Sequence, residues 1–455
     1  MLQLPDILLQ HLQGVHGFDK EALIAAHGLP AVTSVRLNPH KHSMAFADNA
    51  AVPWCASGRY LQARPVFTVD PLYHAGAYYV QEASSMFLHH VLSSHVLNNT
   101  SLRVLDLCAA PGGKSTLIAS FLGADDLLVS NEVIRTRASV LEENMTRWGC
   151  MNTWVTSNDP KDLGRLSGYF DVIVVDAPCS GSGLFRKDAR ALDEWSEANV
   201  LLCSQRQQRI LADVWPALKE DGILIYATCS YSPQEDEEIL DWLADNFEVK
   251  GLSVTTRSEW GVVETQSAKG MYGYRFSPDK VQGEGFFIAA IQKKEETDEL
   301  KPIRYKTLQD KKAQEQTKHL SDTDYTCLQL DKDNYAAIHP AHEADYHTLK
   351  QYVYLRKTGT QLGTPTPKEW LPSHDAAMSI HIAATLPKLE LNKEQALKFL
   401  KKEDFALPDG THKGWILLTY NGLSLGWIKA LGNRFNNYLP KHWRIRMEIS
   451  DMDWA

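Results

Sequence analysis

Strand and helix signals alternate along residues 100–292 of this 455-residue chain, and this alternation constrains the fold more than any other feature. The helical stretches include 134–149 and 198–219. The strand candidates are 103-RVLDLC-108, 127-LLVSNE-132, 154-WVTSND-159, 171-DVIVVD-176, 222-GILIYATC-229 and 284-EGFFIAAIQ-292. Strands that alternate with helices predict an α/β fold with a doubly wound, mainly parallel sheet.

The segment before this region has a more mixed pattern. Within residues 1–95, the run 33-TSVRLNPHK-41 has the pattern of a strand that ends at Asn-Pro. The stretch 78-YYVQEASSMFLHHVL-92 has helical spacing and leads toward the alternating region. A chain of 455 residues is too long for one ordinary core, so we expect two or three domains, with an α+β extension over 1–95 and an α/β domain over 96–292.

The segment after residue 292 divides into two parts. Residues 293–322 are charged and poor in large apolar side chains, which indicates a solvated linker or an exposed helix. Residues 323–455 contain short β-type runs, and Asn-Gly lies between 414-GWILLTY-420 and 423-LSLGWIK-429. Asn-Gly between two such runs predicts a hairpin, so we expect a small β-rich C-terminal module.

Composition excludes several classes of protein. With 44% hydrophobic and 23% charged residues, the sequence is typical of a folded soluble protein, and it lacks an apolar run long enough to cross a membrane. The N-terminus has neither the basic nor the apolar segment of a secretory signal. Seven cysteines without a CxxC pair argue against a disulfide framework and a structural zinc site. We therefore expect a cytoplasmic protein with no metal and no membrane partner.

The net charge of -9 argues mildly against a nucleic-acid partner, but the charge is unevenly distributed. Residues 423–447 contain five cations and no acid: Lys429, Arg434, Lys441, Arg444 and Arg446. Four aromatic residues lie among them: Trp427, Phe435, Tyr438 and Trp443. Cations and aromatic rings together suit the backbone and the bases of RNA. A solvated face over a small aromatic core would have the same composition.

The first strand candidate leads into 106-DLCAAPGGKS-115. Small residues here let a ligand approach the backbone, and the next helix begins with unpaired N–H groups. The ending GGKS also resembles a phosphate-binding P-loop, but that pattern requires Gly where this chain has Cys108. Pro111 also removes an amide donor that a phosphate would use. We therefore expect a ligand other than a phosphate.

Acidic residues end three successive strands of the predicted sheet. Glu132 is placed to accept hydrogen bonds from the two hydroxyls of a ribose, and Asp159 to accept one from an adenine amino group. Asp106 is placed to pair with the ammonium of an amino acid. Acids at these positions suit S-adenosylmethionine, which is cationic and carries no phosphate. Any one of these residues alone is more often a helix cap or a solvated strand end.

Two cysteines follow neighbouring buried strands, in 176-DAPCSG-181 and 228-TCSYSPQEDEE-238. The carboxyl ends of parallel strands are where such sheets bind ligands, so Cys179 and Cys229 indicate sulfur chemistry in one cleft. A thiolate that adds to C6 of a cytosine makes C5 nucleophilic enough to accept a methyl group. Asp176 is suitably placed to bond the N3 edge of the base. A redox disulfide between the two thiols is an alternative.

The remaining cysteines have simpler interpretations. Inert packing is the usual role of a free cysteine, and we assign it to Cys55, Cys150, Cys203 and Cys327. At Cys108, the approach of the backbone to a ligand matters more than the sulfur.

Three strings, 106-DLCAAPGGK-114, 176-DAPCSGSGLFRKD-188 and 228-TCSYSPQEDE-237, closely resemble the Fmu/Sun family of RNA (cytosine-5) methyltransferases. The resemblance covers residues 1–292 and includes 34-SVRLNP-39, 73-YHAGAYYVQEASSM-86 and 285-GFFIA-289. It implies a Rossmann-like, S-adenosylmethionine-dependent methyltransferase domain with an RNA-contacting N-terminal extension.

By this resemblance, Cys229 is the nucleophile, Cys179 promotes release of the product, and Asp176 is part of the catalytic site. Arg186 and Lys187 follow the catalytic loop and are placed to hold the RNA backbone. The residues that the resemblance assigns to the methyl donor are Cys108, Ala109, Ala110, Pro111, Gly112, Gly113, Lys114, Glu132, Arg137, Asp159 and Asp176. Lys114 and Arg137 have an equally good interpretation as surface charges.

The C-terminal part resembles the RsmF-type subgroup, which modifies small-subunit ribosomal RNA, and 425-LGWIKALGNRFNNYLPKHWR-444 is similar to the end of its PUA-like domain. This implies that 323–455 is an RNA-binding module and that the partner is small-subunit ribosomal RNA or the assembling small subunit. We expect a monomer. Two alternatives are open: the same chemistry on transfer RNA, or a ribosome-assembly factor that binds RNA without catalysis.

Overall fold

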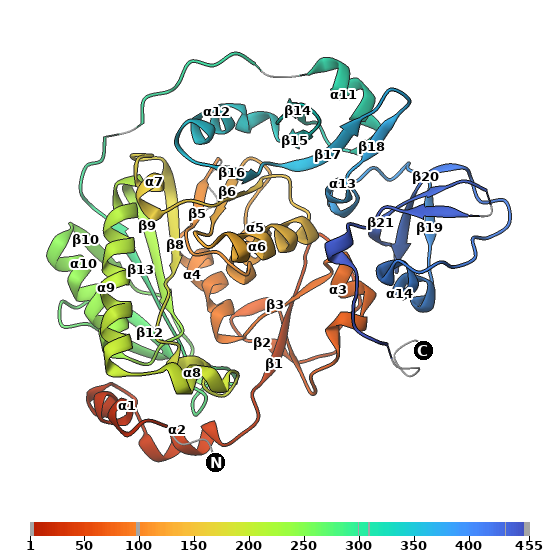
Figure 1. Ribbon diagram of the computed structural model, residues 1–455. Coiled ribbons are helices and arrows are strands. Elements are labelled where there is room, and N and C mark those ends of the chain that lie inside the picture. Colours follow the sequence, from red (N-terminus) through yellow and green to blue (C-terminus); the bar gives the residue numbers. More distant parts are fainter. Residues whose placement is uncertain (1–3, 97–100, 299, 308–309, 433, 450–455) are drawn as a thin grey trace.

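A ten-stranded sheet forms the centre of the computed structural model, which describes residues 4–96, 101–298, 300–307, 310–432 and 434–449 (Figure 1). The strand order is β11-β12-β13-β9-β8-β5-β6-β7-β16, with β10 beside β13. The parallel part consists of β9 (Leu218–Thr228), β8 (Phe170–Asp176), β5 (Arg103–Asp106), β6 (Leu127–Asn131) and β7 (Thr153–Thr156). The strand candidates in this region are therefore confirmed.

The other strands of this sheet run antiparallel to their neighbours, so the expectation of a mainly parallel sheet holds only for its centre. They are β10 (Val249–Leu252), β11 (Val263–Gln266), β12 (Tyr272–Phe276), β13 (Phe286–Lys293) and β16 (Leu355–Lys357). The C-terminal part supplies β16, which pairs with β7 and extends the sheet at that edge. Local periodicity does not reveal such a pairing, because its partners are far apart in the sequence.

Alternate residues of each central strand face opposite layers of helices, as the period of two requires. On one face, Val104 and Val174 pack with α4 (Phe87–His95), α5 (Gly113–Phe121) and α6 (Arg135–Trp148). On the other face, Leu105 and Val175 pack with α7 (Pro160–Gly164), α9 (Glu197–Val214), α10 (Glu237–Asn246) and α12 (Glu343–Tyr352). The molecule therefore has a three-layer, doubly wound core.

The N-terminal part adds two helices and a small sheet. The helices are α1 (Asp6–His11) and α2 (Lys20–His27), and the strand order of the sheet is β2-β3-β1-β4. Its strands are β1 (Thr33–Leu37), β2 (Ala51–Val52), β3 (Cys55–Leu61) and β4 (Tyr78–Val80), and α3 (Pro71–Ala75) precedes β4. The helical prediction for 78–92 is wrong at its start, because Tyr78 and Val80 pair with β1 and the regular helix begins only at Phe87.

Residues after β13 first form α11 (Lys311–Thr317), within the segment expected to be a linker or exposed helix. Two four-stranded sheets follow. The first contains β14 (Thr326–Gln329), β15 (Tyr335–Ile338), β17 (Thr360–Pro365) and β18 (Trp370–Pro372), and α13 (His374–Met378) follows it. The second contains β19 (Lys388–Glu390), β20 (Gly414–Tyr420), β21 (Leu423–Ala430) and β22 (Phe435–Asn437), with α14 (Lys393–Lys401) after β19.

The hairpin predicted around Asn-Gly is confirmed as β20 and β21. Asn421 and Gly422 have φ of 47° and 75°, the left-handed values that a tight two-residue turn requires. Trp427 on β21 is fully buried and donates its ring N–H to the carbonyl of Ser373, so it belongs to the core and cannot stack on a base. Tyr438 and Trp443 retain partial exposure. Within the described residues, no helix has the length and apolar character needed to cross a membrane.

Candidate functional site

Two loops at one edge of the sheet bring the cysteines together. Strands β8 and β9 run parallel with Asp176 opposite Ala227, so the loops that follow them leave the sheet side by side. The Sγ atoms of Cys179 and Cys229 lie 3.0 Å apart, and both residues are partly buried free cysteines. The two thiols predicted to act together therefore lie side by side.

Close backbone contacts fix these loops relative to each other. The N–H of Gly183 donates to the carbonyl of Cys229 at 2.9 Å, and the N–H of Gly285 donates to the carbonyl of Gly183 at 3.1 Å. A Cβ atom at position 183 would lie 2.4 Å from the Gly285 oxygen and 2.8 Å from the Cys229 oxygen. Only glycine fits here, because both clashing atoms belong to the backbone.

The two thiols differ in their electrostatic surroundings. The hydrogen bond with Cys229 raises the pKa of Cys179 well above its ordinary value, and burial and the charge of Glu235 raise it further. Cys179 is therefore a neutral thiol at physiological pH and can donate its S–H to the sulfur of Cys229. A hydrogen bond from such a donor would stabilise a thiolate on Cys229.

A cavity of about 360 Å³ opens beside Cys229. Several residues predicted for the methyl donor line it: Cys108, Ala109, Ala110, Pro111, Gly113, Lys114 and Asp176. The N-terminal extension contributes Gln81 and Glu82, and the start of β13 contributes Phe286. Gln81 was missed in the sequence, although it lies within 73-YHAGAYYVQEASSM-86; the guanidinium of the buried Arg36 holds its side-chain oxygen at 2.8 Å.

The loop after β5 forms one wall of this cavity. Gly112 has a φ of 116°, which residues with a side chain rarely adopt, and it leads directly into α5. Asp106 is fully buried; its Oδ2 accepts from the Ser115 hydroxyl at 2.6 Å, whereas its Oδ1 has no hydrogen-bond partner. Burial raises the pKa of Asp106 to about 7. Burial also raises the pKa of the Cys108 thiol, which supports its interpretation as an inert sulfur.

The acid at the end of β6 has a similar unsatisfied oxygen. Glu132 accepts from the N–H of Ile134 at 2.9 Å, while its buried Oε2 accepts no hydrogen bond and lies 3.5 Å from Arg137. Arg137 also donates to the carbonyl of Ala110 at 2.7 Å, so it braces the loop rather than being a free surface charge. Asp159 caps α7 through the N–H of Lys161 and is partly exposed.

These acids provide a test of the predicted cofactor. Buried carboxylate oxygens on Asp106 and Glu132 that accept no hydrogen bond call for donors, and they would repel a phosphate. S-adenosylmethionine offers such donors, since its methionine part carries an ammonium and its ribose carries two hydroxyls. The residues present therefore fit this cofactor.

A charged pair lies between the donor loop and the cysteines. Lys114 Nζ is 2.6 Å from Asp176 Oδ2 and lies over the ring of Phe286. The Asp176 side chain remains 35% exposed, so one edge of its carboxylate can still reach a ligand in the cavity. Lys114 is thus the ion-pair partner of Asp176, and its interpretation as a surface charge is wrong.

The expectation that Arg186 holds the RNA backbone is also wrong. Its side chain is almost fully buried and pairs with the Glu284 carboxylate through two nitrogens, at 2.9 and 3.0 Å, and with the carbonyl of Gly283. A guanidinium buried and engaged in this way is not available to a phosphate at the surface. Lys187, the next residue, is exposed.

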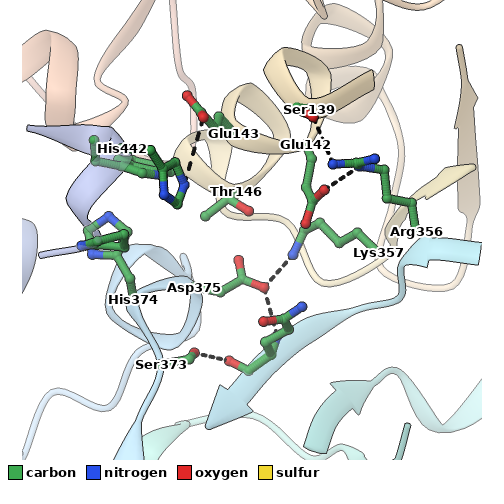
Figure 2. Close-up of a pocket in the computed structure, with 13 residues that line it drawn as sticks. Ser139, Glu142, Glu143, Thr146, Arg356, Lys357, Ser373, His374, Asp375 and His442 are labelled. Atoms are coloured by element: carbon green, nitrogen blue, oxygen red, sulfur yellow. Dashed lines mark hydrogen bonds and ion pairs between the residues drawn. The ribbon is translucent and has the colours of Figure 1, made fainter. Parts of the chain in front are cut away.

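A second cleft, of about 530 Å³, lies between α6, α13 and residues 440–443 (Figure 2). Its charged side chains are paired with each other: Arg356 lies 2.6 Å from Glu142, and Lys357 pairs with Asp375. None of the residues predicted for the donor or the catalytic site lines it. Several of the predicted residues line the smaller cavity beside Cys229 instead.

Comparisons with known proteins agree with this description. Residues 95–292 match the family model of the 16S rRNA methyltransferase RsmB/F, residues 4–83 the N-terminal domain of the 16S rRNA methyltransferase RsmF, and residues 386–445 the methyltransferase RsmF PUA domain. The chain is similar to ribosomal RNA small subunit methyltransferase F of Psychromonas ingrahamii, with 30% identity over 96% of this chain and 97% of that protein.

Two further proteins are similar over large parts of the chain. Ribosomal RNA small subunit methyltransferase F of Shewanella woodyi is 30% identical over 86% of this chain and 84% of that protein. Among solved structures, a methyltransferase homolog protein from Pyrococcus horikoshii aligns with a TM-score of 0.51 and 28% identity, over 64% of this chain and 100% of that chain. The resemblance inferred from the motifs, the Rossmann-like fold and the PUA-like domain are confirmed.

Proposed function

This chain belongs to the RsmB/F family of 16S rRNA methyltransferases, and on that premise we propose that it methylates carbon 5 of a cytosine in small-subunit ribosomal RNA. The methyl donor is S-adenosylmethionine. The observation that carries the proposal is the 3.0 Å separation of the Cys179 and Cys229 sulfurs beside the donor cavity. Methylation of a base nitrogen or a ribose oxygen requires no such pair, because those atoms are nucleophiles already.

We assign the donor site to the loop 108–114 together with Glu132, Arg137, Asp159 and Asp176. Glu132 would accept the ribose hydroxyls, and Asp106 would accept the ammonium of the methionine part. One oxygen of each carboxylate accepts no hydrogen bond, which supports both assignments. When bound there, S-adenosylmethionine supplies an electrophilic methyl group next to Cys229.

Cys229 is assigned as the nucleophile. Its thiolate forms a bond to C6 of the cytosine, and the electron pair of the C5–C6 double bond becomes available at C5. The S–H of Cys179 stabilises this thiolate before attack, because it lies within hydrogen-bond distance. The base must leave its stack to reach the sulfur, so the RNA is expected to bind with the target nucleotide flipped out.

Cys179 is assigned to the release of the product. The hydrogen bond with Cys229 is the largest cause of its raised pKa, and that bond is lost once the sulfur of Cys229 is bonded to carbon. Loss of that bond lowers the pKa of Cys179, although burial and Glu235 continue to raise it. We propose that Cys179 then gives up its proton to solvent and that its thiolate accepts the proton of C5. The C5–H electrons restore the double bond as the C6–sulfur bond breaks, and Cys229 leaves as a thiolate.

Asp176 is assigned to the cytosine N3 edge. Protonation or hydrogen bonding at N3 withdraws electrons from the ring and favours addition at C6. The ion pair with Lys114 keeps Asp176 in place at the cavity, and part of its carboxylate remains exposed there. A carboxylate and N3 are both acceptors, so this contact requires a proton taken up from solvent and shared between the carboxylate and N3.

The C-terminal module, 323–455, is proposed to bind the RNA backbone. Residues 386–449 contain eleven Lys and Arg residues and six Asp and Glu residues, an excess of positive charge in a chain whose net charge is -9. Lys441 and Arg444 are exposed and lie near Lys402. Burial lowers the pKa of Lys402 most, and the charges of these two residues lower it further. Such a cluster suits phosphates.

Bisulfite sequencing of total RNA, with and without this protein, tests the function. We expect one or a few cytosines of small-subunit ribosomal RNA to be protected only when the protein is present. If only transfer RNA contains protected cytosines, the substrate is transfer RNA. If no RNA contains a protected cytosine, the proposal of cytosine-5 methylation is rejected. Cys229→Ala serves as the matched negative control, since it removes only the sulfur.

A further inference from the structure

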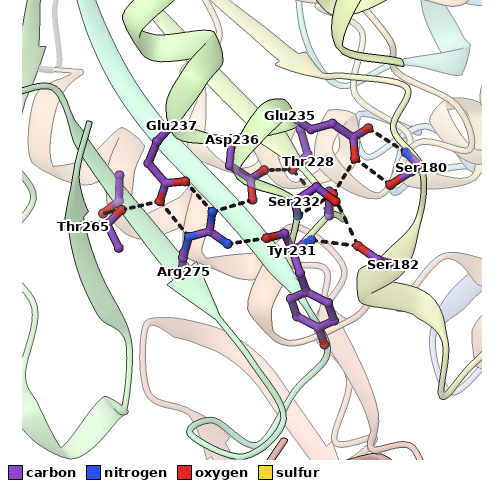
Figure 3. A network of polar contacts seen from close by, with 12 residues as sticks. Ser180, Ser182, Thr228, Tyr231, Ser232, Glu235, Asp236, Glu237, Thr265 and Arg275 are labelled. Atoms are coloured by element: carbon purple, nitrogen blue, oxygen red, sulfur yellow. Dashed lines mark hydrogen bonds and ion pairs between the residues drawn. The ribbon is translucent and has the colours of Figure 1, made fainter. Parts of the chain in front are cut away.

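A buried carboxylate connects the two cysteine loops (Figure 3). Glu235 belongs to the segment between β9 and α10, and its side chain is fully shielded from solvent. Figure 3 shows it pointing toward Ser180 and away from Arg275, the cation of the same network. Glu235 was not singled out in the sequence, although it lies six residues after Cys229 in 228-TCSYSPQEDEE-238.

The contacts of Glu235 reach the residue that follows each cysteine. One oxygen, Oε1, accepts from the N–H of Ser180 at 2.8 Å, and Oε2 accepts from the hydroxyl of Ser180 at 2.6 Å. The same Oε2 accepts from the hydroxyl of Ser230 at 2.6 Å. A single carboxylate therefore bonds the neighbours of Cys179 and Cys229, two segments that no covalent link holds together.

Gln207 on α9 completes this arrangement from the other side. Its side-chain amide donates to the carbonyl of Pro178 at 3.0 Å and to Glu235 Oε1 at 3.3 Å. Cys179 is thus held on both flanks, by Gln207 at Pro178 and by Glu235 at Ser180. The other flank of Cys229 is held by Asp236, which accepts from the hydroxyl of Thr228 at 2.6 Å.

The partners of Glu235 distinguish it from the acids beside it. Asp236 and Glu237 both pair with Arg275, whereas no cation pairs with Glu235 among the residues that the structure describes. All of its partners are hydrogen-bond donors, which suits an ionised carboxylate. A buried carboxylate without a cation is costly unless its hydrogen bonds are satisfied, and here those bonds are made to the two cysteine loops and to Gln207.

We propose that Glu235 is a positioning residue that sets the separation of the two thiols by bonding Ser180 and Ser230 at once. The inference rests on the proposed function in one respect, namely that both thiols act on one base. Hydrogen bonds that lock reacting groups within a fraction of an ångström are what such two-residue chemistry needs.

The test replaces Glu235 by glutamine, which has the same shape. The amide of Glu235→Gln places an N–H against one of the donors that the carboxylate accepts, so the bridge between the loops is broken while the volume is kept. Glu238→Gln is the matched control, because it makes the same chemical change at an exposed position three residues further on. The first readout is the rate at which diamide joins Cys179 to Cys229; diamide takes up the two electrons and two protons that the thiols lose.

We expect Glu235→Gln to slow disulfide formation by about tenfold or more and to lower kcat by about tenfold to a hundredfold, with little change in KM for RNA or donor. The control should match the natural protein in both readouts. Natural rates of disulfide formation and of turnover in Glu235→Gln would overturn the proposal and leave the carboxylate a purely structural role.

A second variant guards against misfolding of Glu235→Gln. Ser230→Ala removes one hydroxyl donor and leaves the carboxylate in place, and the same slower disulfide formation is expected with a smaller loss of kcat. The disulfide readout needs no RNA. Slower disulfide formation in the variants, together with natural protein that makes no 5-methylcytosine, would therefore reject the proposed function and retain the positioning role.

Discussion

Cys179 Sγ lies 3.0 Å from Cys229 Sγ, although 50 residues separate the two in the chain. The parallel pairing of β8 with β9 produces this proximity, because it ends both strands at one edge of the sheet. Cys229 lines a cavity beside the loop that follows β5. The buried acids at the ends of β5 and β6, Asp106 and Glu132, have oxygens without a hydrogen-bond partner, which suit a cationic donor. A thiol next to a methyl-donor site is what covalent methylation of a pyrimidine carbon requires, and the second thiol lies within hydrogen-bond distance of the first.

Binding of S-adenosylmethionine should weaken as the pH falls below about 7. The pKa of Asp106 is raised to about 7, and the ammonium of the donor needs the ionised form. Below that pH the carboxyl is protonated, so we expect Kd for the donor to rise by up to about tenfold per pH unit. Calorimetric titration at several pH values measures this Kd. Asp106→Asn should bind the donor weakly and with no dependence on pH. Asp193→Asn, the same change at an exposed position, should behave as the natural protein.

The same group should affect the stability of the protein without its donor. The folded-state pKa of Asp106 is about 7, above its ordinary value of 3.8, so folding takes up a proton at pH values between these two. The stabilising contribution of its protonated form is therefore lost as the pH rises through about 7. The thermal stability of the protein should decline as the pH rises toward about 7, and Asp106→Asn should remove this decline. If the variant shows the same decline, other groups cause it.

Replacement of Gly183 should disrupt both cysteine loops. The added methyl group of Gly183→Ala would lie 2.4 Å from the Gly285 oxygen and 2.8 Å from the Cys229 oxygen. We expect a loss of about 1–3 kcal/mol in the free energy of unfolding and about a hundredfold loss in methylation rate. Gly14→Ala is the control, because a Cβ at that position meets no atom within 4 Å. Equal effects in the two variants would contradict the close contact.

The C-terminal cations should contribute electrostatic affinity for RNA. The double variant Lys441→Ala/Arg444→Ala should weaken RNA binding and reduce the slope of log K against log salt by about 0.7–0.9 for each phosphate that the protein no longer neutralises. Filter binding at several salt concentrations measures the slope. Lys250→Ala removes an exposed charge from β10 and should leave the slope unchanged; an unchanged slope in the double variant would place the RNA elsewhere.

The sequence predicted those parts of the fold that depend on local pattern. Each candidate strand of the central sheet is a strand, and the turn at Asn421 and Gly422 forms the expected hairpin. The predicted proximity of Cys179 and Cys229 needed only the rule that parallel strands end at one edge. Motifs that follow directly on buried strands therefore predicted which cysteines lie side by side.

The parts that sequence patterns missed depend on contacts between distant segments. Helical spacing over 78–92 hid the pairing of β4 with β1, and the pairing of β16 with β7 has no local signal. A cation after the cysteine loop is typical of an RNA contact, which is why Arg186 was predicted to bind RNA. Its guanidinium instead forms an ion pair with Glu284, a residue distant in the sequence. Only the fold decides whether a charged or aromatic side chain meets solvent or another residue.

Trapping of a covalent complex tests the central assignment most directly. Purified protein is mixed with small-subunit ribosomal RNA and S-adenosylmethionine, denatured, and analysed for a species that contains both RNA and protein. With Cys179→Ala we expect this complex to accumulate, because the adduct forms and is not released, and with Cys229→Ala we expect none. A complex that persists without the sulfur of Cys229, or the absence of any complex in Cys179→Ala, would contradict the account.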